Sequence, residues 1–134
     1  ADVLLTAAQD NDHAAIDMAN TWSHGQRSLL GASDNPGTSN LHMGERLLER
    51  MGDDVYFKDF SACNGFSTEH YDAIHTPTLI ITGDQDKMTP PRAGTAVADM
   101  LVNSRLMHLQ GCGHLMMSEQ PNQVLDAMSA FVLT

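Results

Sequence analysis

Two short apolar segments joined by a helical pattern dominate the second half of the chain. Residues 77–82 are rich in β-branched side chains and are followed by Gly83, which is typical of a buried strand. Apolar residues then recur at helical spacing over residues 91–101, and residues 105–110 form a second candidate strand. Two strands joined by a helix should lie parallel with a right-handed crossover, so the loops that follow them should meet at one edge of the sheet.

The first 75 residues contain helical patterns and no convincing strand pattern. Apolar residues share one helix face within residues 12–22, within residues 41–51 and, over a shorter length, within residues 56–62. The most regular amphipathic pattern lies near the C-terminus, where apolar side chains recur at positions 124, 125, 128, 131 and 132. This pattern predicts a last helix that packs against the sheet.

The loops after the two candidate strands carry the residue types of an acid–histidine pair. Asp84 and Asp86 lie in the turn after the first strand, and His114 ends the loop Gly111-Cys112-Gly113-His114. A histidine that acts as a general base needs a carboxylate at its other ring nitrogen, which fixes the tautomer and stabilises the imidazolium. Open parallel sheets assemble their sites beyond the carboxyl ends of their strands. We therefore expect an aspartate of the first loop to face His114.

Both loops resemble a known pattern. Gly83-x-x-Asp86-x-Met88-Thr89-Pro90, followed by Gly111-x-Gly113-His114 and by Glu119-x-Pro121, is similar to the C-terminal part of the α/β-hydrolase family. The resemblance implies that Asp86 is the triad acid and that His114 is the triad histidine. Asp84 is the alternative acid.

The resemblance also implies a fold and a domain organisation. Residues 76–134 are expected to form the C-terminal part of an α/β-hydrolase core, with a β-α-β-α unit of the parallel sheet. The helices that come before the acid-bearing strand resemble the family's cap, so residues 1–75 are expected to form a helical lid. A lid covers the mouth of the site, excludes water and shapes the substrate pocket.

The nucleophile of this family is not found in the sequence. It sits on a strand-to-helix turn of the form Gly-x-Ser-x-Gly, upstream of the acid and the histidine. Residues 31–35, Gly-Ala-Ser-Asp-Asn, lack the second glycine, and the chain begins at Ala1 without a methionine. We therefore expect the C-terminal portion of a longer hydrolase, whose partner is the N-terminal half of the same protein or a swapped copy of the chain.

The activity that the resemblance implies is that of a serine-type, carboxylesterase-like hydrolase. Its substrate is expected to be a small apolar ester, and no cofactor is needed. The chain without its N-terminal half is expected to be inactive or weakly active. Two alternatives stay open: an aspartate nucleophile would make the same fold a dehalogenase or an epoxide hydrolase, and a separate chain without a nucleophile would suit a non-catalytic binding or assembly module.

Charge and hydropathy argue against several other classes of protein. The net charge is −10, from 7 basic and 17 acidic residues, so the chain has no basic stripe with which to neutralise phosphates. This argues against nucleic acid and anionic membranes as partners. The sequence has no signal-peptide pattern and no apolar run of transmembrane length. These absences constrain the location only weakly, and the cytoplasm is slightly favoured.

The spacing of cysteine and histidine does not predict a metal centre. Cys63 and Cys112 show neither disulfide nor metal-ligand spacing, and the seven histidines include no His-x-x-x-His pair. Cys112 lies close to His114 in the sequence, but a neighbour in a tight loop usually points elsewhere and a buried thiol is normally inert. The nine methionines favour adaptable apolar packing, either in the core or in a pocket wall.

Overall fold

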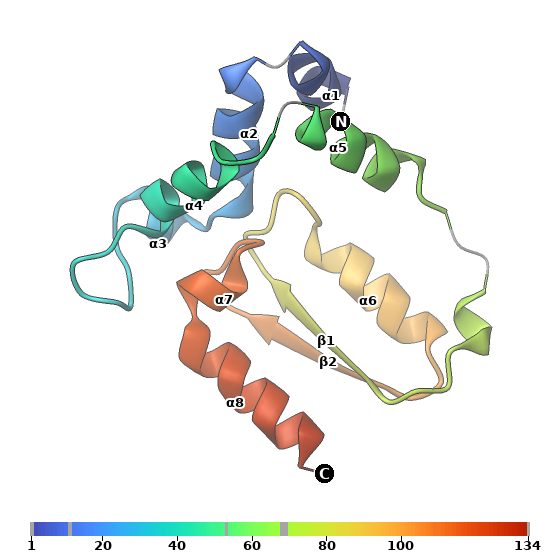
Figure 1. Cartoon of the computed structure of the whole chain (residues 1–134). Coiled ribbons are helices and arrows are strands. Elements are labelled where there is room, and N and C mark those ends of the chain that lie inside the picture. The colour runs from blue at the N-terminus through green and yellow to red at the C-terminus, as the bar shows by residue number, and fades with distance from the viewer. Residues whose placement is uncertain (1, 11, 53, 68–69, 134) are drawn as a thin grey trace.

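The computed structural model describes residues 2–10, 12–52, 54–67 and 70–133. Figure 1 shows a group of helices at one end and a small sheet flanked by helices at the other. The helices before the sheet are α1 (Asp2–Gln9), α2 (His13–Ser23), α3 (Gln26–Leu29), α4 (Asn40–Leu48), α5 (Val55–Gly65) and a short 3-10 helix (Tyr71–Ala73). The remaining elements are β1 (Thr78–Gly83), α6 (Pro91–Met100), β2 (Ser104–Leu109), α7 (Met116–Glu119) and α8 (Pro121–Val132).

The sheet is the part that the sequence predicts most closely. Strands β1 and β2 pair in parallel, in a register that joins Thr78 to Ser104 and Gly83 to Leu109. Helix α6 connects the strands and packs against both, while α8 lies on their other side (Figure 1). The predicted α/β fold, helices followed by a parallel β-α-β unit and further helix, is therefore confirmed.

Local sequence signals explain where several helices begin. The side chain of Asp12 accepts a hydrogen bond from the Ala14 N–H (3.0 Å) at the start of α2. The Ser39 hydroxyl accepts one from the His42 N–H (3.2 Å) at the start of α4. Helices α6 and α8 both begin at a proline, whose missing N–H breaks no helical hydrogen bond in the first turn. These caps satisfy donors that a helix start otherwise leaves unpaired.

Some details differ from the sequence-based expectation. Helix α5 is as long as α2, although the pattern over residues 56–62 predicted a shorter helix. The four-residue helices α3 and α7 were not predicted, because so short a segment shows no apolar periodicity. Helix α8 packs against the sheet, as its pattern predicted, but its apolar residues are unevenly buried: Val124 is buried, whereas Leu125 is 61% exposed and Val132 is 77% exposed. The two strands among the described residues cover only part of its apolar face.

Among the described residues, the buried apolar side chains form two clusters. One consists of Leu4, Ala8, Ala15 and Ala19 in α1 and α2, with aromatic side chains of α2 and α5 packed against it. The other consists of Leu109, Cys112 and Val124, where β2, the loop after it and α8 meet. Met88, from the loop after β1, packs against the first cluster and so joins the sheet region to the helical region.

Candidate functional site

The loops after β1 and β2 bring a carboxylate and an imidazole together. His114 Nδ1 lies 2.8 Å from Asp86 Oδ2, which is hydrogen-bonding distance. Asp86 is buried, whereas 44% of the His114 side chain is exposed. A carboxylate at Nδ1 leaves Nε2 as the ring nitrogen for proton transfer. The two side chains are thus neighbours, and their catalytic roles stay a prediction.

The two aspartates of the first loop have different partners. Asp86 Oδ1 accepts hydrogen bonds from the backbone N–H groups of Met88 and Thr89, at 2.9 and 2.8 Å. These bonds orient the carboxylate so that Oδ2 meets the imidazole. Asp84 is exposed, and its Oδ1 accepts a hydrogen bond from the Cys112 N–H at 3.2 Å. Asp84 therefore ties the two loops together through the backbone, while Asp86 binds the histidine side chain.

Glycine at particular positions allows the two loops to pack closely. A Cβ at Gly83 would collide with the carbonyl oxygen of Cys112, so the end of β1 has no room for a side chain. The same carbonyl accepts a hydrogen bond from the Gln85 N–H at 2.9 Å. Gly111 has φ of +69°, a left-handed conformation that L-residues with a Cβ rarely adopt. Glycine is therefore required at position 83 by the close approach of the other loop and favoured at position 111 by the backbone conformation.

The C-terminal end of α2 holds both loops, a contact that no sequence pattern indicated. The carbonyl oxygen of Ser23 accepts hydrogen bonds from the N–H groups of His114 (2.8 Å) and Leu115 (3.1 Å). The carbonyl oxygen of Trp22 accepts one from the Lys87 N–H (3.2 Å). Because every residue type offers a backbone carbonyl, side-chain patterns cannot reveal such contacts.

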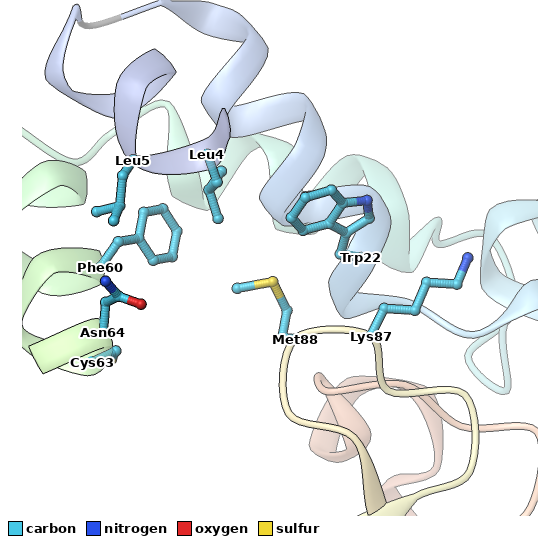
Figure 2. Close-up of a pocket in the computed structure, with 8 residues that line it drawn as sticks. All are labelled: Leu4, Leu5, Trp22, Phe60, Cys63, Asn64, Lys87 and Met88. Carbon is cyan, nitrogen blue, oxygen red and sulfur yellow. The ribbon is translucent and has the colours of Figure 1, made fainter. Parts of the chain in front are cut away.

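An apolar cavity lies beside the acid loop. Figure 2 shows side chains of α1, α2 and α5 turned towards Met88 and Lys87. The cavity has a volume of about 260 Å³ and is lined by Leu4, Leu5, Trp22, Phe60, Cys63, Asn64, Lys87 and Met88. Lys87 and Met88 directly follow Asp86, so one loop carries both the acid and part of the cavity wall.

The buried Cys112 is not arranged as a nucleophile. Cys112 is fully buried, and burial, followed by the charge of Glu119, raises the pKa of its thiol to about 12. A thiol that stays protonated at neutral pH is a poor nucleophile. Cys112 therefore does not replace the serine that the family's pattern requires. Cys63 is an exposed free cysteine in α5.

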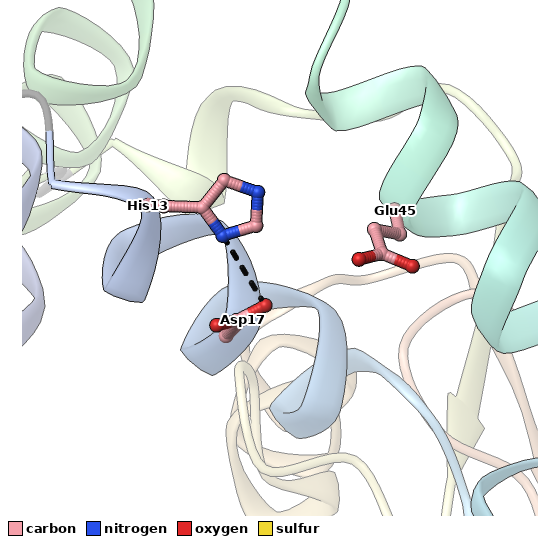
Figure 3. A group of neighbouring side chains, drawn as sticks. All are labelled: His13, Asp17 and Glu45. Atoms are coloured by element: carbon pink, nitrogen blue, oxygen red, sulfur yellow. Dashed lines mark ion pairs between the residues drawn. The ribbon is translucent and has the colours of Figure 1, made fainter.

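One group of side chains has the composition of a metal site. His13 and Asp17 of α2 and Glu45 of α4 each offer one ligand atom, and these atoms lie within 4.8 Å of one another (Figure 3). His13 Nδ1 lies 3.5 Å from Asp17, and its Nε2 lies 3.5 Å from Glu49. The hydrogen bond to Glu49, followed by the charge of Asp17, raises the pKa of His13. More than half of the His13 and Asp17 side chains is exposed, and surface ion pairing accounts for this arrangement without a metal.

The parallel β-α-β unit and the neighbouring carboxylate and imidazole are the features that the resemblance to the α/β-hydrolases predicted. Residues 51–134 match the family model described as TAP-like protein, and the chain belongs to this family of α/β-hydrolases. The recognised resemblance is therefore confirmed. Within the described residues, no helix combines the length and the apolar character needed to cross a membrane.

Curated relatives match a segment of the chain. One segment of 61 residues is 41% identical to a Mycobacterium tuberculosis protein named as a non-heme bromoperoxidase, BpoC. The matched segment makes up 46% of this chain and 23% of that relative. A segment of 64 residues is 31% identical to the monoacylglycerol lipase ABHD6 of Rattus norvegicus. This segment makes up 48% of this chain and 19% of that relative. The chain thus spans about a quarter or less of these relatives.

Solved structures match nearly the whole chain. An esterase from Exiguobacterium antarcticum has a TM-score of 0.82 at 15% identity, over 99% of this chain and 47% of that protein. A thermophilic esterase has a TM-score of 0.71 at 25% identity, over 90% of this chain and 45% of that protein. A bromoperoxidase from Bacillus anthracis has a TM-score of 0.77 at 14% identity, over 99% and 48%. The chain therefore has the fold of about half of an α/β-hydrolase.

Proposed function

We propose that this chain supplies the acid and the histidine of a Ser-His-Asp triad in a carboxylesterase-like α/β-hydrolase. The observation that carries the proposal is the 2.8 Å distance between His114 Nδ1 and Asp86 Oδ2. The N–H groups of Met88 and Thr89 fix the other carboxylate oxygen, so Asp86 can orient the imidazole and stabilise its protonated form.

The reaction then follows the course of acyl transfer to serine. His114 Nε2 takes the proton of a serine hydroxyl as the serine oxygen attacks the ester carbonyl, and gives this proton to the departing alcohol. A water molecule attacks the acyl-enzyme in the same way, and the acid is released. Backbone N–H groups of the nucleophile-bearing segment stabilise the oxyanion. These steps require no cofactor.

An apolar ester is the substrate class that suits the site. The cavity beside the acid loop is lined mainly by apolar side chains, with Asn64 and Lys87 among them, and the apolar part favours an acyl chain or another apolar group (Figure 2). One relative is named as a monoacylglycerol lipase, and two similar structures are esterases. In this proposal residues 1–75 form the lid, residues 76–134 belong to the core, and the lid helices set the preference for the acyl group.

The serine in this proposal comes from outside the chain. The family's Gly-x-Ser-x-Gly turn does not occur in the sequence, and the chain spans about half of the solved hydrolases that it resembles. The N-terminal half of the same protein supplies the nucleophile, or a second copy does so by exchange. The chain by itself is then a piece of the enzyme with little or no activity.

Hydrolysis of a p-nitrophenyl ester tests the proposal in three samples. These are the chain alone, the complete protein, and the chain mixed with the separately produced N-terminal half. We expect turnover in the complete protein and in the mixture, and little in the chain alone. A folded complete protein that cleaves no ester would contradict the proposal. Turnover of a haloalkane or an epoxide would instead indicate an aspartate nucleophile, and ligand binding without turnover would indicate a binding module.

A further inference from the structure

Glu119 is a buried carboxylate that the reaction described above does not use. It ends α7 and is 5% exposed. Its Oε1 accepts a hydrogen bond from the Gly25 N–H at 2.8 Å, and its Oε2 accepts one from the Gly113 N–H at 2.5 Å. A buried charge is costly unless it is hydrogen-bonded, and bonds from backbone N–H groups to a carboxylate are among the stronger ones.

The two donors belong to different parts of the fold. Gly25 follows α2 in the helical region, whereas Gly113 directly precedes His114 in the loop after β2. One carboxylate with an oxygen for each segment therefore joins the helical region to the histidine loop. Both glycines are buried, so water cannot replace Glu119 as the acceptor without entering the core.

The backbones of these two segments are in direct contact. A Cβ at Gly113 would lie 2.5 Å from the carbonyl oxygen of Ser23, and a Cβ at Gly25 would lie 2.7 Å from that of Gly111. On one side, the Ser23 carbonyl accepts hydrogen bonds from the N–H groups of His114 and Leu115. On the other side, Glu119 is the acceptor for Gly113. The backbone next to His114 is thus held from both sides.

We propose that Glu119 is a positioning residue for the triad histidine. Its carboxylate fixes the backbone of Gly113 against Gly25, and this holds the His114 imidazole at hydrogen-bonding distance from Asp86. Glu119 acts through the backbone and does not touch the reacting atoms. The inference rests on the proposed role of His114 and adds to it a residue outside the triad.

The neighbouring thiol is compatible with this role. Cys112 Sγ lies 3.7 Å from Glu119 Oε2, close enough for a weak hydrogen bond from the thiol to the carboxylate. Burial and the negative charge of Glu119 both disfavour the thiolate. Cys112 therefore stays a neutral thiol, and no second buried negative charge lies next to the Glu119 carboxylate.

Glu119→Gln in the complete protein tests the proposal. Glutamine has the same shape but one acceptor and one donor at its end, so it can bind only one of the two N–H groups and must face the other with an NH₂. We expect kcat for the ester to fall about 10- to 100-fold, because small misplacements of a catalytic group have effects of this size. We expect KM to change little, and the pH dependence of kcat/KM to shift. The control is Asp126→Asn, an exposed carboxylate of α8, which should leave both constants unchanged.

A proton NMR measurement separates this inference from the proposed function. The proton between His114 Nδ1 and Asp86 should give a downfield resonance in the complete protein, and Glu119→Gln should weaken or broaden it. If the unsubstituted protein cleaves no ester, the proposed function fails, and the resonance still decides the role of Glu119. A folded Glu119→Gln variant with unchanged kcat, pH profile and resonance would overturn the inference. If this variant does not fold, Glu119→Asp, which keeps the charge but has a shorter reach, is measured in the same way with the same outcomes.

Discussion

Asp84 and Asp86 form a matched pair of carboxylates for testing the triad. They lie in one turn, but only Asp86 contacts the imidazole. We expect Asp86→Asn to lower kcat of the complete enzyme about 10³- to 10⁴-fold, because an amide cannot hold the imidazole in the correct tautomer. His114→Ala should lower it by about 10⁴-fold, while Asp84→Asn should cost less than about tenfold. Steady-state kinetics with a p-nitrophenyl ester measure all three, and the opposite order for the two aspartates would exchange their roles.

Cys112 allows a prediction about stability and pH. In the folded chain burial, with Glu119, raises the pKa of its thiol from 9.0 to about 12. Below the ordinary pKa the thiol is protonated in both states, so its packing contributes fully to the free energy of unfolding. Between pH 9 and 12 the unfolded thiol ionises first, which favours unfolding. Stability should therefore be lost as pH rises through this window.

The predicted loss of stability can be measured by urea unfolding of the unsubstituted chain and of Cys112→Ala, from about pH 8 to about pH 11. The difference in unfolding free energy between the two proteins should shrink as pH increases above 9. Cys112→Ala also removes the thiol next to Glu119, but that contact does not change in the folded state over this range. A difference that stays constant with pH would show that the folded thiol titrates normally.

Among single residues, those with a side-chain pattern were predictable and those that act through the backbone were not. Gly83, Asp86 and Pro90 make the acid loop recognisable in the sequence, because a strand end, a turn and a helix start each favour particular residue types. The Ser23 carbonyl, which holds the histidine loop, has no such signature. Glu119 was part of the motif, but its partners are backbone N–H groups that only the fold brings together.

At the scale of elements, hydrophobic periodicity predicted where α8 lies but not which of its residues are buried. Val124 packs with Leu109 and Cys112 and is 5% exposed, while the adjacent Leu125 is 61% exposed. Both belong to the same apolar stripe in the sequence. Burial within the stripe depends on how far the sheet extends, which is a property of the whole assembly and not of the helix.

This difference gives a prediction about stability at the element scale. Val124→Ala removes buried methyl groups and leaves a small cavity, so it should lower the free energy of unfolding by about 1–2.5 kcal/mol. Leu125→Ala should change it by less than about 0.5 kcal/mol, because most of that side chain remains in water. Urea unfolding of the chain measures both. Equal losses would mean that Leu125 is covered in solution.

In the whole molecule, the helices before β1 and the sheet region meet at the candidate site. Met88 packs into the helical cluster, and the end of α2 binds both the acid loop and the histidine loop. An α/β fold with preceding helices could be predicted from the sequence. The contact between Ser23 and the histidine loop could not be predicted, because it joins residues far apart in the chain. The helices before β1 thus hold the loops that carry Asp86 and His114 and also line the cavity beside them.

Two opposing forces act on the surface of the chain. Large apolar side chains are exposed at the C-terminal end of α6 and along α8 to the residue after it, namely Met100, Val102, Leu125, Met128, Val132 and Leu133. Among the described residues, β1 and β2 also have no further strand at their outer edges. A net charge of −10 opposes association through these surfaces by repulsion between copies. The balance between the two forces therefore depends on ionic strength.

We expect the separate chain to associate with itself more strongly as salt increases. From about 0.02 M to about 0.5 M salt, the range of charge repulsion falls from roughly 20 Å to a few ångströms, while hydrophobic attraction persists. Light scattering after gel filtration should show a rising average mass. The double variant Leu125→Gln, Val132→Gln keeps the net charge and should reduce this rise, whereas Asp126→Asn on the same helix should not. Adding the N-terminal half should suppress self-association if that half covers α8 and the sheet edge. A chain that stays monomeric over the whole range would mean that these exposed apolar groups attract no partner.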